Sequence, residues 1–407
     1  MGNLFSHLFY LFLTSPVLSP AVNGTSLYLF LVIPLIDPEF LRYLRNKRFN
    51  PNSLLAALLL LAASIPYASL HFVLKVVSII VAVGYMQYTL KVGRFHLYKY
   101  INLNVAVALV QVVGLLTFQR AWLFPLDVGT ALWGKYALAT GPTPAEAEGI
   151  LLAFRFSGLS REPGFFASLV IISFLLLLDH RKVPRRRFHL LIHAIGIVVS
   201  FSKISLAFFA VFPFVFFFRR FVEKVPKSLV VGGVLATMVA ATLYVYDYYG
   251  VDYVNQSFQH RTFGYALLRE LSAGDLLFGV GFRNVVSRAG QIPLIMHSSM
   301  YERYPDMIAG GSGLASIIID HGVLFFLMLV FLLYLVEANA YELLLFLLMS
   351  INDNPLASQS YVLLGIYYML FNRYSDAYAW RLAEALGPTG RPCPGGTSAR
   401  VGRVTSA

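Results

Sequence analysis

The sequence carries little charge and almost no cysteine. Only 13% of its residues are charged and 58% are hydrophobic, whereas soluble domains carry about 25% charged residues. This composition excludes a soluble globular fold, because too little polar surface is available to cover the molecule. The single cysteine, Cys393, excludes an internal disulfide and any metal site built from several cysteines.

Acidic residues are also scarce. The chain has 20 Asp and Glu against 32 Lys and Arg, for a net charge of +12. In so apolar a chain, this excess indicates membrane topology and contact with anionic lipid, and we expect no nucleic-acid partner.

Long apolar runs predict an all-α polytopic membrane protein with about 12 transmembrane helices. The runs lie at residues 4–19, 24–38, 54–66, 70–90, 100–118, 164–179, 189–200, 204–218, 228–246, 312–334, 341–351 and 357–371. Several are shorter than the ~20 residues that a straight transmembrane helix needs, so their ends must lie in the interface. No basic residue precedes the first run, unlike a cleaved signal peptide, and we expect that run to stay as a membrane helix.

Basic residues form four clusters, each between an even-numbered run and the next odd-numbered one. The clusters are Arg42, Arg45, Lys47 and Arg48; Lys91, Arg94 and Lys99; Arg181, Lys182, Arg185, Arg186 and Arg187; and Arg219, Arg220, Lys224 and Lys227. If both termini are cytoplasmic, all four clusters are cytoplasmic too, as the positive-inside rule requires.

This topology divides the chain into six parts. They are N-terminal transmembrane helices (1–118), a first extracytoplasmic loop (119–163), further transmembrane helices (164–246), a second extracytoplasmic loop (247–311), C-terminal transmembrane helices (312–371) and a cytoplasmic tail (372–407). The tail is rich in Gly, Pro, Ser, Thr and Arg, and we predict that it is disordered.

The second loop contains no lysine but five arginines, together with His260 and His297. The arginines are Arg261, Arg269, Arg283, Arg288 and Arg303. Because the planar guanidinium group matches phosphate with two parallel hydrogen bonds, the loop is typical of an active site for a phosphate-bearing lipid. The alternative is an ordinary solvated loop whose arginines pair with its own acidic residues.

Residues 262–273 have apolar side chains at helical spacing, which predicts a helix lying on the outer membrane surface and ending at Gly274 and Asp275. Gly279 and Gly281 follow. They allow a close backbone approach to a ligand, although a simple turn is the more common explanation of such a pair.

Four segments resemble the superfamily of O-antigen polymerases (Wzy) and O-antigen ligases. The first is Arg-x-x-Gly-x-x-x-Glu-Pro at residues 155–163, and the second is Ser200-Phe-Ser202-Lys203, where the family has Arg in place of Lys203. The third is Arg261 followed by the Gly-x-Gly at Gly279 and Gly281. The fourth is His297 and then Asp320-x-Gly322 in the next apolar run; Ser298 stands where the family has Asn.

The resemblance implies a membrane glycosyltransferase on the outer face of the cytoplasmic membrane. It implies that the donor is a polyprenyl-diphosphate-linked glycan and the acceptor a second glycan, with a chain-length regulator as a further protein partner. A polymerase of oligosaccharide repeat units for O-antigen, capsule or exopolysaccharide is one outcome. A ligase that moves finished glycan to a lipid A core is the other, and the shared motifs do not separate them.

The predicted site combines cations with one base. Breaking the anomeric bond releases a diphosphate, and we expect Arg155, Arg261 and Arg283, aided by Lys203, to stabilise its charge. The sequence has no Asp-x-Asp and no histidine cluster with metal spacing, so we predict no metal and no cofactor.

Two residues are candidates for the base that takes the acceptor proton. His297 titrates near neutral pH, and its alternative role is that of a structural hydrogen-bonding group. Glu162 is the second candidate, and its alternatives are a salt bridge to Arg161 or a carboxylate at a helix N-terminus.

Asp320 and His321 lie inside an apolar run, where ionisable groups are costly; they are functional or they hold the loop near the interface. A flippase or transporter is a less favoured function, because we find no internal repeat and the extracytoplasmic arginines gather in loops.

Overall fold

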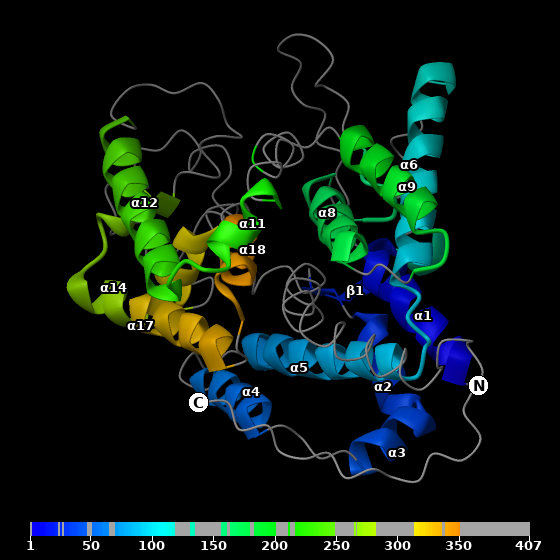
Figure 1. Ribbon diagram of the computed structural model, residues 1–407, viewed down its shortest axis with the longest axis horizontal. Coiled ribbons are helices and arrows are strands. Elements are labelled where there is room, and N and C mark those ends of the chain that lie inside the picture. Colours follow the sequence, from blue (N-terminus) through cyan, green and yellow to red (C-terminus); the bar gives the residue numbers. More distant parts are fainter. Residues whose placement is uncertain are drawn as a thin grey trace.

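A computed structural model describes fifteen parts of the chain. They are residues 2–22, 25–26, 28–46, 51–64, 70–118, 131–134, 156–160, 163–179, 183–200, 211, 216–248, 264–265, 267–281, 313–335 and 338–350. Within them the fold is almost entirely α-helical (Figure 1). The described strands are β1 (Ala21–Val22) and β2 (Thr25–Ser26), a short antiparallel pair. The predicted all-α class is therefore confirmed.

The helices vary widely in length. In chain order they are α1 (Gly2–Thr14), η1 (Pro16–Leu18), η2 (Leu29–Leu31), α2 (Val32–Ile36), α3 (Pro38–Asn46), α4 (Pro51–Ser64), α5 (Leu70–Lys91), α6 (Leu97–Phe118), α8 (Pro163–Asp179), α9 (Arg186–Val199), α11 (Arg219–Val222), α12 (Lys227–Tyr248), α14 (Ala273–Phe278), α17 (Leu314–Leu335) and α18 (Ala340–Ser350).

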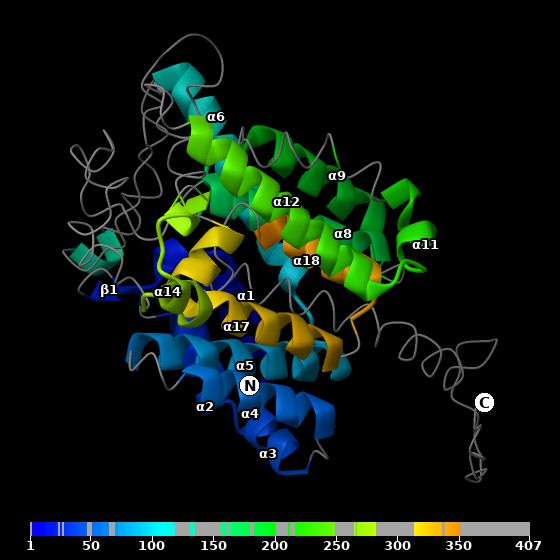
Figure 2. The same cartoon turned by 90° about the vertical axis from the view of Figure 1, so that its left-hand side faces the viewer.

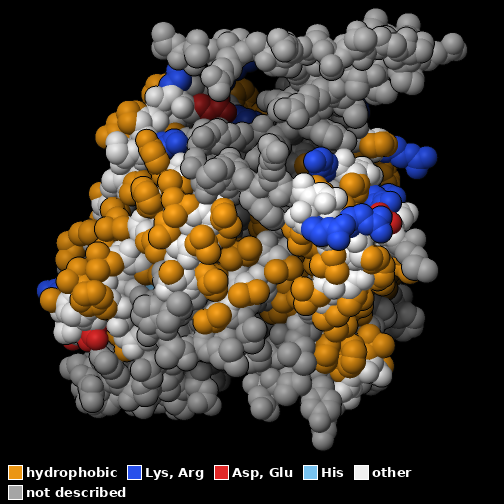
Figure 3. All heavy atoms as spheres, turned by 90° about the horizontal axis from the view of Figure 1, so that it is seen from below, with side chains coloured by type: hydrophobic (Ala, Val, Ile, Leu, Met, Phe, Trp, Pro, Cys, Tyr) orange, Lys and Arg blue, Asp and Glu red, His pale blue; other side chains and the backbone are white. Residues whose placement is uncertain are grey.

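Three of these helices are long and apolar enough to cross a membrane, within α6, α12 and α17. Of the α12 window only 6% is buried inside the protein, although the helix is strongly apolar. Figure 3 shows hydrophobic side chains spread over a broad face of the molecule. Because soluble proteins rarely expose apolar patches of this extent, the three helices indicate a membrane protein.

The apolar run at residues 24–38, which predicts one transmembrane helix, does not form a single helix in the described structure. It is divided into β2, η2 and α2, and α3 begins at Pro38. Asp37 is extended, with φ −80° and ψ 105°. Proline disfavours the α conformation of the residue before it, so Pro38 ends α2 at Ile36. The described residues thus show three candidate spans and not twelve.

The described helices form two groups joined through α4 and α5. In Figure 1, α1, α6, α8 and α9 lie on one side of the molecule, and α11, α12, α14, α17 and α18 lie on the other. Helix α4 packs against both α5 and α17, and Figure 2 shows α4 and α5 beneath α17. One hydrophobic cluster includes buried residues from both groups.

Candidate functional site

All six predicted site residues lie outside the described part of the chain: Arg155, Glu162, Lys203, Arg261, Arg283 and His297. Their roles therefore stay predictions. The structure does describe segments close to them in the chain, namely residues 156–160, α8 from Pro163, Ser200 at the end of α9, and residues 279–281. These segments are the described neighbours of the predicted site residues in the chain.

Helices α1 and α6 run in the same direction. The Asn3 amide oxygen lies 3.0 Å from His96 Nε2, and His7 Nδ1 lies 3.0 Å from the Tyr100 hydroxyl. Further along, the Asn104 amide donates to the Thr14 carbonyl at 2.9 Å. Because these contacts advance together along both helices, the starts of α1 and α6 share one end of the group.

Helix α9 follows the same direction, and α8 runs against it. The Asn102 amide lies 2.8 Å from His189 Nδ1, near the starts of α6 and α9. The Ser173 hydroxyl lies 2.9 Å from His193 Nε2, midway along α8 and α9. Gly196 lets the helices approach, because a Cβ there would overlap Val105 of α6.

The four helices consequently have two chemically different ends. The starts of α6 and α9 carry Lys99 and Arg186, members of the second and third basic clusters, and the start of α1 lies at the same end. At the opposite end, α8 begins at Pro163 and α9 gives way to Ser200. Glu162 directly precedes Pro163 in the chain, and Lys203 follows Ser200 by three residues. Both matched segments therefore adjoin the end of the group opposite the basic clusters.

Residues 156–160 belong to the first matched segment and are held by α6. The Gln111 amide accepts from the Gly158 N–H (3.0 Å) and donates to the Gly158 carbonyl (3.3 Å). The Asn104 amide oxygen accepts from the Leu159 N–H at 2.8 Å. At the same end, the Trp133 indole N–H donates to the Leu18 carbonyl at 3.2 Å, so part of the first long loop packs on the end of α1.

The third and fourth segments that resemble the superfamily, the Gly-x-Gly and the Asp-x-Gly, are in backbone contact. The Val280 N–H donates to the Ile319 carbonyl (2.8 Å), and the Gly281 N–H donates to the Asp320 carbonyl (3.1 Å). A Cβ on Gly279 would lie 2.5 Å from the Asp320 carbonyl oxygen. The Gly-x-Gly turn therefore brings the backbone close to α17, at the Asp-x-Gly.

We found no match of this chain to a protein-family model, to a curated protein or to a solved structure.

The predicted surface helix at residues 262–273 is only partly correct. Helical residues occur at 264–265 and 267–268, and Leu267 is fully buried. The chain then turns, and α14 begins at Ala273, where the Ser272 hydroxyl accepts from the Asp275 N–H as an N-cap. Gly274 and Asp275 therefore open a new helix and do not end the previous one, because the serine before them provides a cap.

Asp320 and His321 are buried, with 5% and 0% of their surface exposed. They precede Gly322, whose backbone leaves the helical conformation with φ 83° and ψ 165°. The carbonyl of Asp320 accepts a hydrogen bond from the Gly281 N–H, so the backbone at this pair contacts the second long loop. A chemical role of the two side chains stays a prediction.

Ser173 and His193 form a buried serine–histidine pair. His193 Nδ1 lies 2.7 Å from the His189 carbonyl, which can only accept, so Nδ1 carries the proton and Nε2 accepts from the Ser173 hydroxyl. This polarity would suit an activated serine. Both side chains are 0% exposed, however, so the pair links α8 to α9 as an interhelical hydrogen bond.

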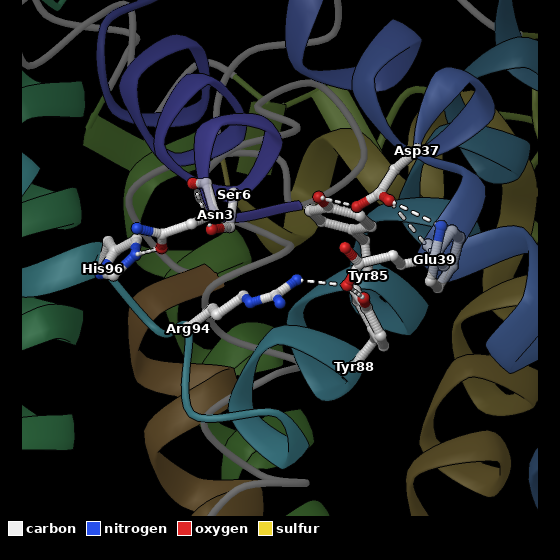
Figure 4. A network of polar contacts seen from close by, with 9 residues as sticks. Asn3, Ser6, Asp37, Glu39, Tyr85, Tyr88, Arg94 and His96 are labelled. Carbon is white, nitrogen blue, oxygen red and sulfur yellow. Dashed lines mark hydrogen bonds and ion pairs between the residues drawn. The ribbon is translucent and has the colours of Figure 1, made fainter. Parts of the chain in front are cut away.

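A polar network joins α3, α5 and the α5–α6 connection at the basic end (Figure 4). The buried Asp37 carboxylate accepts from the Tyr85 hydroxyl at 2.7 Å and from the Glu39 N–H at 3.0 Å. Arg94 pairs with Glu39 at 2.6 Å, and its hydrogen bond lowers the pKa of that carboxyl. Burial lowers the pKa of His96 to about 4, with a smaller contribution from nearby positive charge.

In the part of the chain that the structure describes, no group of three or more His, Cys, Asp or Glu side chains could hold a metal ion. The functional candidates that the sequence analysis missed are Asn104 and Gln111. A signal for them was present, because two amides seven residues apart lie on one face of a largely apolar helix.

Proposed function

We propose that this protein is a membrane glycosyltransferase that polymerises polyprenyl-diphosphate-linked oligosaccharide repeat units on the outer face of the cytoplasmic membrane. The observation that carries the proposal is the antiparallel pair α8 and α9. At the end opposite the basic clusters, these two helices adjoin two of the segments that resemble the Wzy and ligase superfamily. The contact of residues 279–281 with α17 supports it further, because both sides of that contact belong to segments that resemble the superfamily.

The proposed topology has about 12 spans with both termini in the cytoplasm. Three observations support it: the first three basic clusters have members at the basic end, Lys227 lies 4.4 Å from the Tyr334 ring, and Arg219 lies 4.9 Å from the Tyr341 ring. The start of α12 thereby lies beside the end of α17, as expected if both are cytoplasmic.

The proposed reaction forms a glycosidic bond and releases polyprenyl diphosphate. An acceptor hydroxyl oxygen attacks the anomeric carbon of the donor, the bond from that carbon to the diphosphate oxygen breaks, and the hydroxyl proton passes to His297 or Glu162. Arg155, Arg261 and Arg283, with Lys203, compensate the charge that develops on the leaving diphosphate. We propose that these cations replace a divalent metal.

Two other functions use or move the same donor, and the experiment described next distinguishes them from the proposed polymerase. A ligase would use the same donor but add one finished glycan to a lipid A core. A flippase would move the donor across the bilayer without forming a bond.

Purified protein in lipid nanodiscs should convert a polyprenyl-diphosphate repeat unit into a ladder of longer lipid-linked glycans, in excess chelator as well as without it. Loss of activity in chelator, restored by magnesium or manganese, would overturn the proposed metal independence. A single addition to a core acceptor would identify a ligase. Transport of a labelled donor in vesicles, with no new glycosidic bond, would show that the protein is a flippase and not a glycosyltransferase.

A further inference from the structure

The segment at residues 156–160 lies inside the protein although it is not helical. Phe156 is 5% exposed, Leu159 is 7% exposed and Ser160 is 1% exposed. Buried backbone N–H and C=O groups need partners, and a segment outside a helix or sheet must take them from side chains. Here the partners come mainly from α6.

Gly158 is the point of closest approach between this segment and α6. Its φ of +57° favours glycine, and a Cβ would lie 2.7 Å from the Asn104 carbonyl oxygen. Gln111 binds both the N–H and the carbonyl of this residue, so one side-chain amide provides the hydrogen-bond partners for both backbone groups of Gly158.

Asn104 connects the segment to α1 as well as to α6. Its oxygen accepts from the Leu159 N–H, and its nitrogen donates to the Thr14 carbonyl at 2.9 Å and to the Ser15 hydroxyl at 3.2 Å. The Leu159 carbonyl in turn accepts from the Val17 N–H at 3.4 Å. Residues 158–159 are thus held by two helices.

We infer that Asn104 and Gln111 are positioning residues for Arg155 and Glu162, the predicted site residues that flank this segment in the chain. The inference rests on the proposed function. Arg155 directly precedes the anchored segment, and Glu162 follows it by two residues. Catalytic groups must be held closely, because a displacement of about 1 Å can cost about a hundred-fold in rate.

The first test is the Gln111→Leu variant, which keeps the approximate size of the side chain but removes both hydrogen bonds to Gly158. We expect kcat for glycan transfer to fall between about ten-fold and about a hundred-fold, while the amount of protein in the membrane stays close to normal. The control is Asn102→Leu on the same helix, because the Asn102 amide contacts His189 and not the segment. The control should keep kcat within two-fold.

A second measurement does not depend on activity. In a Cys393→Ser background, Ser160→Cys places the only thiol at a buried site whose hydroxyl has no hydrogen-bond partner in the described structure, so the change breaks no hydrogen bond. We expect slow labelling by a thiol reagent, and labelling at least ten-fold faster once Gln111→Leu is added.

Three results would overturn the inference. Unchanged labelling in the double variant would show that Gln111 does not anchor the segment. An unchanged kcat in Gln111→Leu, or an equal loss in Asn102→Leu, would show that the amides of Asn104 and Gln111 contribute only to helix packing and do not position the site. If labelling rises but the unmodified protein transfers no glycan, the anchoring stands, and the role of Arg155 and Glu162 falls with the proposed function.

Discussion

Arginine and lysine carry the same charge but present it to phosphate differently. The guanidinium group of arginine offers two parallel N–H donors to a phosphate group, and the lysine ammonium group acts as a single point charge. If the second loop binds a diphosphate, the identity of its cations therefore matters more than their charge.

We predict that Arg261→Lys lowers glycan transfer by at least about ten-fold while the protein still accumulates in the membrane. The matched control is Arg269→Lys, because Arg269 is an exposed residue in the turn that follows residues 267–268. The control should stay within about two-fold of the unmodified protein. The measurement is the length distribution and rate of glycan formation by each variant. Near-normal glycan formation by the Arg261→Lys variant would show that Arg261 is an ordinary surface charge with no specific role in binding the diphosphate.

The second prediction at the residue scale concerns the base. A lone imidazole must be neutral to accept the acceptor proton, so the rate should rise with pH through a pKa near neutrality. In His297→Ala this rising limb should disappear, while binding of the donor persists. The experiment compares the pH dependence of kcat for both proteins. The same profile in both would leave Glu162 as the remaining candidate.

At the scale of elements, glycine determines how α14 meets α17. Gly322 has a φ of +83° inside α17, and a Cβ on it would overlap the Leu277 carbonyl. This backbone conformation is almost restricted to glycine and costs other residues about 1–3 kcal/mol before any overlap is counted. Gly279 makes the reciprocal approach toward Asp320 and His321.

We predict that Gly322→Ala destabilises the protein by at least about 2 kcal/mol and separates the Gly-x-Gly turn from α17. Gly232→Ala in α12 is the control, since nothing lies within 4 Å of a Cβ at that position. Alanine there should be neutral or stabilising by about 0.5–1 kcal/mol, because glycine is a poor helix former. Thermal unfolding in detergent measures both. Equal stability of the two variants would show that the close approach is not required.

At the scale of the whole molecule, the orientation of the helices decides whether the proposed chemistry is possible. The donor would lie at the outer face, so the long loops must be outside and the basic clusters inside. Arg94 of the second basic cluster pairs with Glu39 of α3, which brings α3 and the α5–α6 connection to the same end.

We predict that cysteines introduced singly at Thr143 and Ser299, in a Cys393→Ser background, react with an impermeant thiol reagent in whole cells whose outer envelope has been opened. A cysteine at Val183, next to the third basic cluster, should be protected until the membrane is permeabilised. The opposite pattern would invert the topology and remove the proposed active site from the outer face.

Much of the framework could be predicted from local properties of the sequence. Apolar runs indicated most of the helices correctly, and Pro51 and Pro163 mark the first residues of α4 and α8. The run at residues 24–38 is divided into β2, η2 and α2, which its average hydropathy did not predict, and Pro38 sets the end of α2 at Ile36. The surface helix was only partly predicted, because its helical residues end at residue 268 and a new helix, capped by Ser272, begins at Ala273.

The sequence by itself determined the membrane class and the excess of basic residues in the helix connections. Those features follow from composition and short-range spacing. Only the tertiary structure decided that Gly158 meets Asn104 and Gln111, and that the Gly-x-Gly turn meets α17 at Asp320. Such contacts join segments far apart in the chain, and they depend on which buried backbone groups each helix can reach, which residue spacing does not encode.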